Sequence, residues 1–297
     1  MTETRIANDH LSVTVSDLGA EMQSLRDAQG RDYLWDGDPA FWSGRSPILF
    51  PIVGRAPGDR ITIGDHTAPM AQHGFARRSR FALLTAEPTA CTHELTPDDA
   101  IRAVYPPAFR LELTHRLDGA TLHVTATVTN PGTAPLPFGL GFHPAFRWPL
   151  PGAEGQPHHV TLDGGANPEM ARLAGGLLPP ARHPSPFAKG RLTLEQSLFE
   201  ADAMLFPGSA IPGLTYGPDT GPRLRFGFDN LPDLALWTKP GAPFVCIEPW
   251  HGTAARTTDG PAIEDRPGTI LLSGRDTVQF GLQICLLNNS DNRVMSA

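Results

Sequence analysis

The sequence predicts an all-β protein, a large antiparallel β-sandwich or barrel with very little helix. Its 30 glycines and 31 prolines make up about a fifth of the 297 residues and are spread along the whole chain without a repeat period. So many breakers leave little room for amphipathic helices, and no apolar i, i+3, i+4, i+7 stripe exceeds two turns. Period-two alternation is frequent instead, which is typical of half-buried strands. The lack of intervening helices argues against a parallel α/β architecture.

The strand-like runs follow one another with turn residues between them. The clearest is 122–128, where apolar residues alternate with His and Thr before Asn130-Pro-Gly132 turns the chain into a second run, 136–142. Runs of the same character cover residues 11–15, 111–115, 224–228, 234–238, 244–247 and 278–287. Many short strands with turn chemistry between them indicate antiparallel pairing.

Domain boundaries are not visible in the sequence. The most linker-like stretch, 149–186, is rich in Gly, Pro and His but also contains the apolar pieces 160–162 and 177–178. A long insertion over one face of a single domain explains it at least as well as a linker does. We therefore expect one domain over residues 1–297, with the polar end 288–297 frayed.

Composition limits the class of function. A formal charge of −7 opposes broad attraction to nucleic acid or to an anionic membrane, so a small-molecule partner is expected. No stretch approaches the roughly 20 apolar residues of a membrane span, and the first residues lack the apolar segment of a signal peptide, which favours a cytoplasmic location. Of the three cysteines, Cys246 and Cys285 lie in apolar strand patterns as structural thiols. The chain is expected to be a monomer or a homodimer.

Two segments carry candidate chemistry. Gly139-Leu-Gly-Phe-His143-Pro-Ala-Phe146 and Phe244-Val-Cys-Ile-Glu248-Pro-Trp-His-Gly252 each end an apolar run in an ionisable residue followed by proline. Proline forces the preceding residue to be extended and cannot donate to a sheet ladder, so both residues are predicted to lie where a strand stops pairing. A proton donor and a proton acceptor at strand ends are the minimum needed for general acid and base catalysis.

The faces of these two runs add detail. Gly139 and Gly141 share a face with His143, which suggests that a ligand or another chain segment approaches the backbone there. Glu248 follows a run that is apolar on both faces, so burial should raise its pKa towards neutrality. A structural histidine and an arginine-paired glutamate fit the same patterns. The patterns alone do not decide between these readings.

A third region decides the assignment. Residues 41–55 (FWSGRSPILFPIVGR) and 72–77 (QHGFAR), taken with the two segments above, resemble the aldose 1-epimerase (galactose mutarotase-like) family, in particular its bacterial LacX-type branch. The resemblance runs from Leu18 to about Leu286. Each motif is short, but their order and spacing are specific.

The resemblance implies a mutarotase-like supersandwich that interconverts the α and β anomers of an aldose without a cofactor or metal. It implies that Glu248 is the base, that His143 is the acid, and that His73 and Arg55 contact the sugar. It places the aspartate that binds sugar hydroxyls most plausibly at Asp202, although Glu200 lies nearby. The galactose enzymes of the family lack Pro-Trp-His-Gly after the glutamate, so their substrate is not transferred.

Other site residues and functions stay open at this point. Trp250 or Trp237 could offer an aromatic face to the sugar. Arg77 could belong to a solvated basic patch, or read a phosphate as in a related branch that acts on hexose 6-phosphates. That activity would require Arg55 and Arg77 to converge on the pocket. A sugar-binding or sensing protein without turnover is a further alternative. A metal hydrolase is disfavoured because none of the 11 histidines forms a metal-binding motif.

Overall fold

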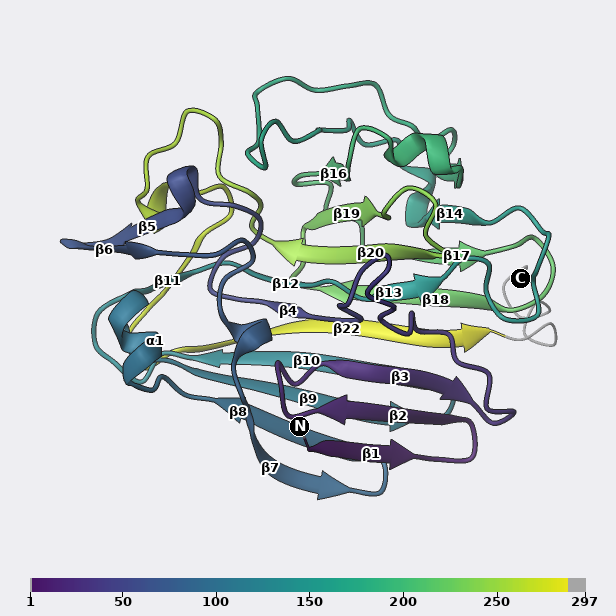
Figure 1. Ribbon diagram of the computed structural model, residues 1–297, viewed down its shortest axis with the longest axis horizontal. Coiled ribbons are helices and arrows are strands. Elements are labelled where there is room, and N and C mark those ends of the chain that lie inside the picture. The colour runs from purple at the N-terminus through teal and green to yellow at the C-terminus, as the bar shows by residue number, and fades with distance from the viewer. Residues whose placement is uncertain (1, 288–297) are drawn as a thin grey trace.

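The computed structural model describes residues 2–287 and confirms an all-β protein (Figure 1). Its largest layer is a nine-stranded antiparallel sheet. In spatial order the strands are β15 (Arg191–Thr193), β14 (His159–Leu162), β17 (Gly213–Gly217), β18 (Arg223–Asp229), β22 (Thr277–Leu287), β10 (Thr121–Thr129), β9 (Arg110–Asp118), β8 (Ala90–Leu95) and β7 (Ala82–Glu87).

A second antiparallel sheet lies along one side of this layer and carries the segments of interest (Figure 1). Its strands are β16 (Met204–Phe206), β19 (Asp233–Trp237), β20 (Phe244–His251), β12 (Leu140–Phe142) and β4 (Ile48–Leu49), with β13 (Ala145–Arg147) also pairing with β20. A three-stranded sheet made of β1 (Glu3–Ala7), β2 (Leu11–Ser16) and β3 (Met22–Asp27) has contacts through β1 with β7, β8 and β9.

The remaining elements are short. Two-stranded pairs are formed by β5 (Arg60–Ile63) with β6 (His66–Pro69) and by β11 (Leu136–Phe138) with β21 (Ile270–Leu272). Within residues 2–287 the one α-helix is α1 (Asp99–Val104), and no helix there is long and apolar enough to cross a membrane. Single 3₁₀ turns cover Pro57–Asp59, Ala76–Arg78, Asp163–Gly165, Gln196–Phe199 and Ile263–Asp265.

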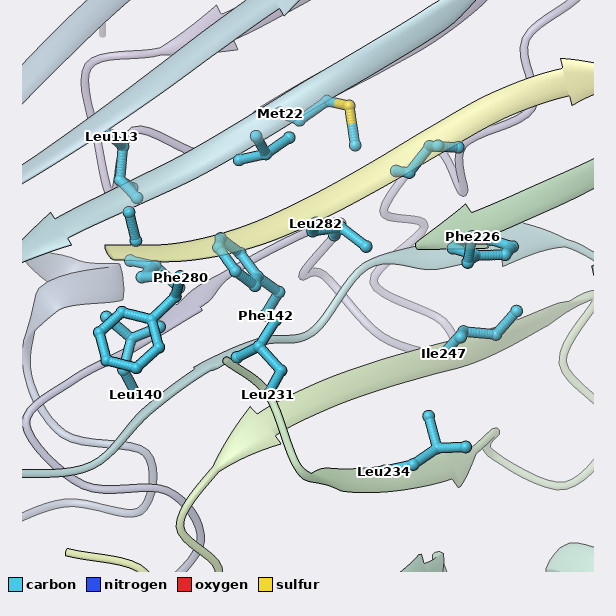
Figure 2. Packing of buried hydrophobic residues seen from close by; sticks show 14 of the residues in the cluster. Met22, Leu113, Leu140, Phe142, Phe226, Leu231, Leu234, Ile247, Phe280 and Leu282 are labelled. Atoms are coloured by element: carbon cyan, nitrogen blue, oxygen red, sulfur yellow. The ribbon is translucent and has the colours of Figure 1, made fainter. Parts of the chain in front are cut away.

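One buried cluster joins the sheets. Phe142 of β12, Leu234 of β19 and Ile247 of β20 lie across from Phe280 and Leu282 of β22 (Figure 2). All five side chains are at most 5% exposed. Burying such a side chain contributes about 1.5–3 kcal/mol each. The buried cluster is therefore continuous between the two largest sheets. The predicted frayed end, 288–297, lies outside the described residues.

The predicted strands are present, with two differences near the candidate site. The predicted run 136–142 is divided at Gly139: β11 pairs with β21, whereas β12 pairs with β20 and β4. The prediction that Glu248 ends its strand is wrong, because β20 continues through Pro249 to His251.

The position of Pro249 in the sheet explains why the strand continues. The N–H of Ile247 donates to Pro144 O, on the side of β20 where β13 and β12 pair. The nitrogen of Pro249 faces the same side two residues later. In the register that β12 and β13 share, Pro249 lies opposite Phe142, the last residue of β12, so the missing N–H falls where that pairing ends.

Within the Gly- and Pro-rich stretch 149–186, residues 159–162 form β14 of the nine-stranded sheet, and a later part passes over the outer face of the six-stranded sheet. Its residues Ala171 and Leu178 are buried in a small cluster with Leu205 of β16, Ala235 of β19 and Trp250 of β20. This later part therefore covers one face of the six-stranded sheet, and Leu173 within it lines the cavity described next.

Candidate active site

His143 and Glu248 are brought together by the interruption between β12 and β13. β12 ends at Phe142, and the N–H of His143 donates to Pro47 O at 3.1 Å, which confirms the predicted strand end. Glu248 lies within β20 opposite Ala235 of β19. Because side chains alternate along a strand, Val245 and Ile247 enter the main core while Cys246, Glu248 and Trp250 face the opposite side.

The two ionisable groups face each other directly. Nε2 of His143 lies 3.2 Å from Oε2 of Glu248. The residues are 7% and 2% exposed, respectively, and both line a cavity of about 350 Å³. Other lining residues come from several separate stretches of chain: Trp42, Gly54, Gln72, His73, Arg77, Leu173, Asp202, Ala203, Leu205, Trp237, Trp250 and Ala254.

Aromatic rings surround the imidazole of His143. The indole of Trp42 stacks on it with ring centroids 5.0 Å apart at 27°, and Trp237 meets it edge-on at 5.9 Å. His73 is also edge-on, at 5.6 Å. Packing on three sides fixes the ring orientation and excludes water, so Nε2 stays directed at the carboxyl group.

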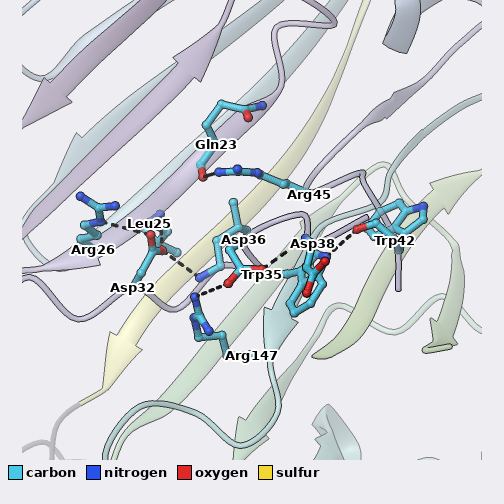
Figure 3. Close-up of polar contacts among 11 residues, drawn as sticks. Gln23, Leu25, Arg26, Asp32, Trp35, Asp36, Asp38, Trp42, Arg45 and Arg147 are labelled. Atoms are coloured by element: carbon cyan, nitrogen blue, oxygen red, sulfur yellow. Dashed lines mark hydrogen bonds and ion pairs between the residues drawn. The ribbon is translucent and has the colours of Figure 1, made fainter. Parts of the chain in front are cut away.

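The loop that carries Trp42 is tied down by polar contacts (Figure 3). The carbonyl oxygen of Trp42 accepts a hydrogen bond from Nε1 of Trp35 at 2.8 Å. Arg45 donates to Gln23 O at 2.6 Å, and its main-chain N–H donates to the Glu21 carboxylate at 2.7 Å. These contacts attach the loop to the three-stranded sheet and hold the stacked indole in place.

Burial favours the uncharged form of both members of the pair. It raises the pKa of Glu248 well above its usual range, and the nearby Asp202 adds to this effect. Burial, with a smaller contribution from Arg77, lowers the pKa of His143 to about 3. In a desolvated site the two groups therefore share one proton near neutrality.

His73 is held as a neutral imidazole. Its Nδ1 accepts the N–H of Gly54 at 3.1 Å, so the ring proton is on Nε2, which lies 3.2 Å from the side-chain amide of Gln72. Burial and the neighbouring His143 lower its pKa well below 6.5. His73 and Gly74 both have positive φ, 66° and 72°, and a Cβ at Gly74 would lie 2.1 Å from Phe50 O. The turn that presents His73 therefore requires glycine next to it.

Three more predicted site residues line the cavity. Asp202 does so from an exposed position with φ 67°, and its carbonyl oxygen accepts from Arg172. Arg77 donates through Nη2 to Gln72 O at 2.9 Å, while its buried Nε has no protein partner. Trp250 is 4% exposed, and its Nε1 likewise has no protein partner.

Arg55 is not among the cavity residues. Its guanidinium forms a two-point ion pair with Asp59, with both N–O distances 2.6 Å, and its side chain is 45% exposed. A second arginine, Arg266, is buried next to the main chain of Arg55. It donates to the carbonyl oxygens of Val53, Thr253 and Arg55. Burial lowers the pKa of Arg266 to about 10.

Sequence reasoning missed Trp42 and Gln72 as cavity residues, although both lie within the motif segments. The stacking of Trp42 depends on the path of the loop 28–47, which no local pattern fixes. Gly44 was a usable signal, because a Cβ there would lie 2.5 Å from the Trp42 ring.

A possible metal-ligand set overlaps this pair. Ligand atoms of His143, Cys246 and Glu248 all lie within 4.8 Å of one another. Burial raises the pKa of the Cys246 thiol well above its usual value, as it does for Glu248. Thiolate and carboxylate are the forms that bind metal, so a metal here would have to displace the protons that burial holds on Cys246 and Glu248.

Known proteins resemble this chain in sequence. The profile of the family described as aldose 1-epimerase matches residues 3–277. The chain belongs to this family. The chromosomal protein LacX of Lactococcus lactis subsp. lactis is 30% identical over 297 residues, covering 95% of this chain and 99% of LacX.

Solved structures agree with the fold. A galactose mutarotase related enzyme from Lactobacillus acidophilus superposes with a TM-score of 0.91 at 26% identity, over 97% of this chain and 98% of that one. A galactose mutarotase-like protein from Lactobacillus casei has a TM-score of 0.86 at 28% identity, over 96% and 100% of the two chains. The galactose mutarotase-like fold predicted from the sequence motifs is therefore confirmed.

Proposed function

We propose that this member of the family is a cofactor-independent aldose 1-epimerase, which interconverts the α and β anomers of an aldose by opening and closing the sugar ring. The observation that carries the proposal is the 3.2 Å contact between Nε2 of His143 and Oε2 of Glu248 inside a cavity of about 350 Å³. The anomeric hydroxyl and the ring oxygen of an aldose are bonded to the same carbon. An adjacent donor and acceptor can therefore reach both oxygens at once.

In the proposed ring opening, the Glu248 carboxylate takes the proton of the anomeric hydroxyl while His143 gives the proton on Nε2 to the ring oxygen. The C1–ring oxygen bond breaks, and the anomeric carbon becomes a free aldehyde. Rotation about the C1–C2 bond presents the other face of the aldehyde. Ring closure then reverses both proton transfers and gives the other anomer.

The number of protons held by His143 and Glu248 together is compatible with this cycle. The carboxylate–imidazolium form and the neutral form contain the same number of protons and differ only in which atom holds the shared one. Ring opening converts the first form into the second, which is the form that burial favours. Ring closure regenerates the first form, so neither step needs a proton from water.

General acid and general base catalysis each supply about 10²–10⁴-fold, so together they lower the barrier by roughly 5–11 kcal/mol. The other cavity residues would orient the sugar. Asp202 offers acceptors for hydroxyl groups, and the side-chain amide of Gln72 lies close to the pair. Leu173 and Trp237 supply apolar surface for the sugar C–H groups.

A polarimetric assay of glucose and galactose mutarotation tests the proposal. Glu248→Gln removes the base but keeps the side-chain shape, so we expect kcat/KM to fall by about 10²–10⁴-fold. Glu200→Gln is the matched control, because Glu200 is exposed and outside the cavity. Wild-type protein that accelerates mutarotation of no aldose would support a sugar-binding or sensing role instead, and near wild-type activity in Glu248→Gln would contradict the assignment of the base.

A hexose-6-phosphate 1-epimerase is the second candidate, favoured by Arg77, a cationic residue that lines the cavity. The convergence of Arg55 with Arg77 that this activity requires is not found, since Arg55 pairs with Asp59 outside the cavity. Competition between glucose and glucose 6-phosphate in the same assay separates the two activities.

A further inference from the structure

Among the described residues, Trp42 is the one aromatic neighbour that lies nearly parallel to the imidazole of His143. The ring centroids are 5.0 Å apart and the planes meet at 27°. Trp237 and His73 are close to perpendicular to the imidazole, at 80° and 86°. The face of an indole is electron-rich, and tryptophan is the side chain that most strongly attracts a cation held over its face within about 6 Å of the centroid. A protonated His143 lies where the indole attracts it.

The chain around Trp42 fixes the indole in this position. Its main-chain N–H donates to Asp38 O at 3.0 Å. Lys239 donates through Nζ to the carbonyl oxygen of the preceding residue, Phe41, at 3.2 Å. A Cβ at Gly44 would lie 2.5 Å from Cζ2 of the indole, so the chain that follows packs directly against the ring. The stacked indole is therefore a fixed part of the cavity wall.

The surroundings of the pair otherwise oppose its carboxylate–imidazolium form. Burial is the main cause that lowers the pKa of His143 to about 3, and the guanidinium of Arg77 adds to this effect. Burial and the nearby Asp202 raise the pKa of Glu248. The proposed ring opening starts from the charged form, so a contact that stabilises the imidazolium increases the rate of this step.

Other neighbours of His143 are uncharged. Burial lowers the pKa of His73 well below 6.5, and it raises the pKa of the Cys246 thiol, whose Sγ lies within 4.8 Å of the ligand atoms of the pair. Nδ1 of His143 is buried and forms no hydrogen bond with another residue. Within residues 2–287, the contacts that favour the imidazolium are therefore the Glu248 carboxylate, the main chain of His143 itself and the face of Trp42.

We infer that Trp42 is a positioning residue that acts through His143: its ring face stabilises the imidazolium and so increases the fraction of pairs that are ready to open the sugar ring. The inference rests on the proposed function for its effect on rate. Its effect on the position of the shared proton is independent of turnover. Because the site is desolvated, the contact belongs to the stronger class of cation–π interactions.

Fluorinated tryptophans, incorporated at position 42 alone by nonsense suppression, test the electrostatic part of the contact. Fluorine withdraws electron density from the ring face and changes the shape of the indole little. We expect kcat for mutarotation to fall with each added fluorine, by about tenfold for a trifluorinated ring, which corresponds to about 1.4 kcal/mol. A kcat that is independent of fluorination overturns the inference.

The same analogues at position 148 are the matched control. Trp148 packs against Phe199 and lies outside the cavity, so kcat should not change. A purely structural role of Trp42 would likewise leave kcat insensitive to fluorination at position 42, because the packing is preserved.

¹⁵N NMR of His143 measures the same effect without turnover. The chemical shift of Nε2 is an average over pairs in which this nitrogen carries the shared proton and pairs in which Glu248 carries it. Fluorination at position 42 should move the shift towards that of an unprotonated nitrogen, and fluorination at position 148 should leave it unchanged. A shift that stays the same with fluorinated Trp42, or moves the other way, overturns the inference.

The two readouts separate this inference from the proposed function. Wild-type protein that accelerates mutarotation of no aldose would contradict the proposed function, and the Nε2 shift would still decide the role of Trp42. Active wild-type protein whose kcat and Nε2 shift both ignore fluorination at position 42 would contradict the role of Trp42 alone.

Discussion

Two pairs of buried histidines give the clearest view of how this fold separates structure from chemistry. His93 of β8 and His115 of β9 are 1% and 3% exposed and share a buried face with Cys91 and Leu113. His73 and His143 are each 7% exposed and lie beside the cavity. Burial lowers the pKa of all four, so desolvation alone does not distinguish the pairs.

The difference lies in what each pair faces. Among the described residues, His143 is paired with a buried carboxylate at 3.2 Å, whereas neither His93 nor His115 forms an ion pair. The cavity gives the first pair access to a ligand, while neither His93 nor His115 lines it. A neutral buried imidazole is thus a packing group unless a second titratable group and a space for substrate are placed beside it.

The largest expected effect comes from His143→Asn. Loss of the acid should lower kcat/KM for mutarotation by about 10²–10⁴-fold, and the double variant with Glu248→Gln should be little worse, because the two groups act as a unit. His115→Asn, compared per folded molecule, should keep wild-type kcat/KM. Equal losses in the two single variants would remove the distinction between the histidine pairs.

Gly141→Ala should have the next largest effect on activity. Its Cβ would overlap the Trp250 ring at 2.3 Å, so the indole must move within the cavity. We expect a loss of about tenfold or more in kcat/KM and about 1–3 kcal/mol of destabilisation. Gly260→Ala is the control, because a Cβ there meets no atom within 4 Å. Denaturant unfolding and polarimetry measure both effects, and wild-type values for Gly141→Ala would contradict the packing argument.

The buried pair His93 and His115 should affect the free energy of unfolding at acid pH. The folded-state pKa of His115 is about 3, below the ordinary 6.5, so the unfolded chain binds the proton first. Its contribution is fully present above pH 6.5 and is lost as the pH falls towards 3, at roughly 1 kcal/mol per pH unit. His115→Leu should flatten this part of the stability profile without changing activity. An unchanged profile would show that His115 is not the group responsible.

The smallest expected effect concerns the acid side of the profile of kcat/KM against pH, where we expect no loss of activity near pH 6.5. Because His143 binds a further proton only at about pH 3, kcat/KM should not fall as the pH drops through the ordinary imidazole range near 6.5. It should fall on the alkaline side, as the pair loses its shared proton through the raised pKa of Glu248. A half-loss of activity near pH 6.5 would mean that His143 titrates as a solvent-exposed imidazole.

The sequence predicted the parts of this molecule that local patterns control. Alternation in residues 122–128 and the apolar run 244–247 identified β10 and β20, and the proline after His143 identified a strand end. The proline after Glu248 misled, because its effect depends on which strand lies beside it. Pro249 lies opposite Phe142, where β12 ends, and this is a feature of the assembled sheet rather than of the segment.

The cavity shows the same limit. Motif order identified His73, Asp202, Arg77 and Trp250 as candidates, and all four line the cavity. Arg55 matched the motif equally well, but its guanidinium forms an ion pair with Asp59, four residues later, outside the cavity. The stacking of Trp42 on His143 depends on a loop anchored to another sheet through Glu21 and Gln23. Such contacts are long-range and leave no period in the sequence.

Exchange NMR of an aldose gives the most direct test that the carboxylate at 248 and the imidazole at 143 interconvert anomers. The account predicts cross peaks between the α and β anomeric protons of at least one aldose in the presence of catalytic amounts of wild-type protein. It predicts that these peaks vanish with Glu248→Gln under the same conditions. Cross peaks of equal intensity with the variant, or none with wild type across hexoses and pentoses, would contradict it.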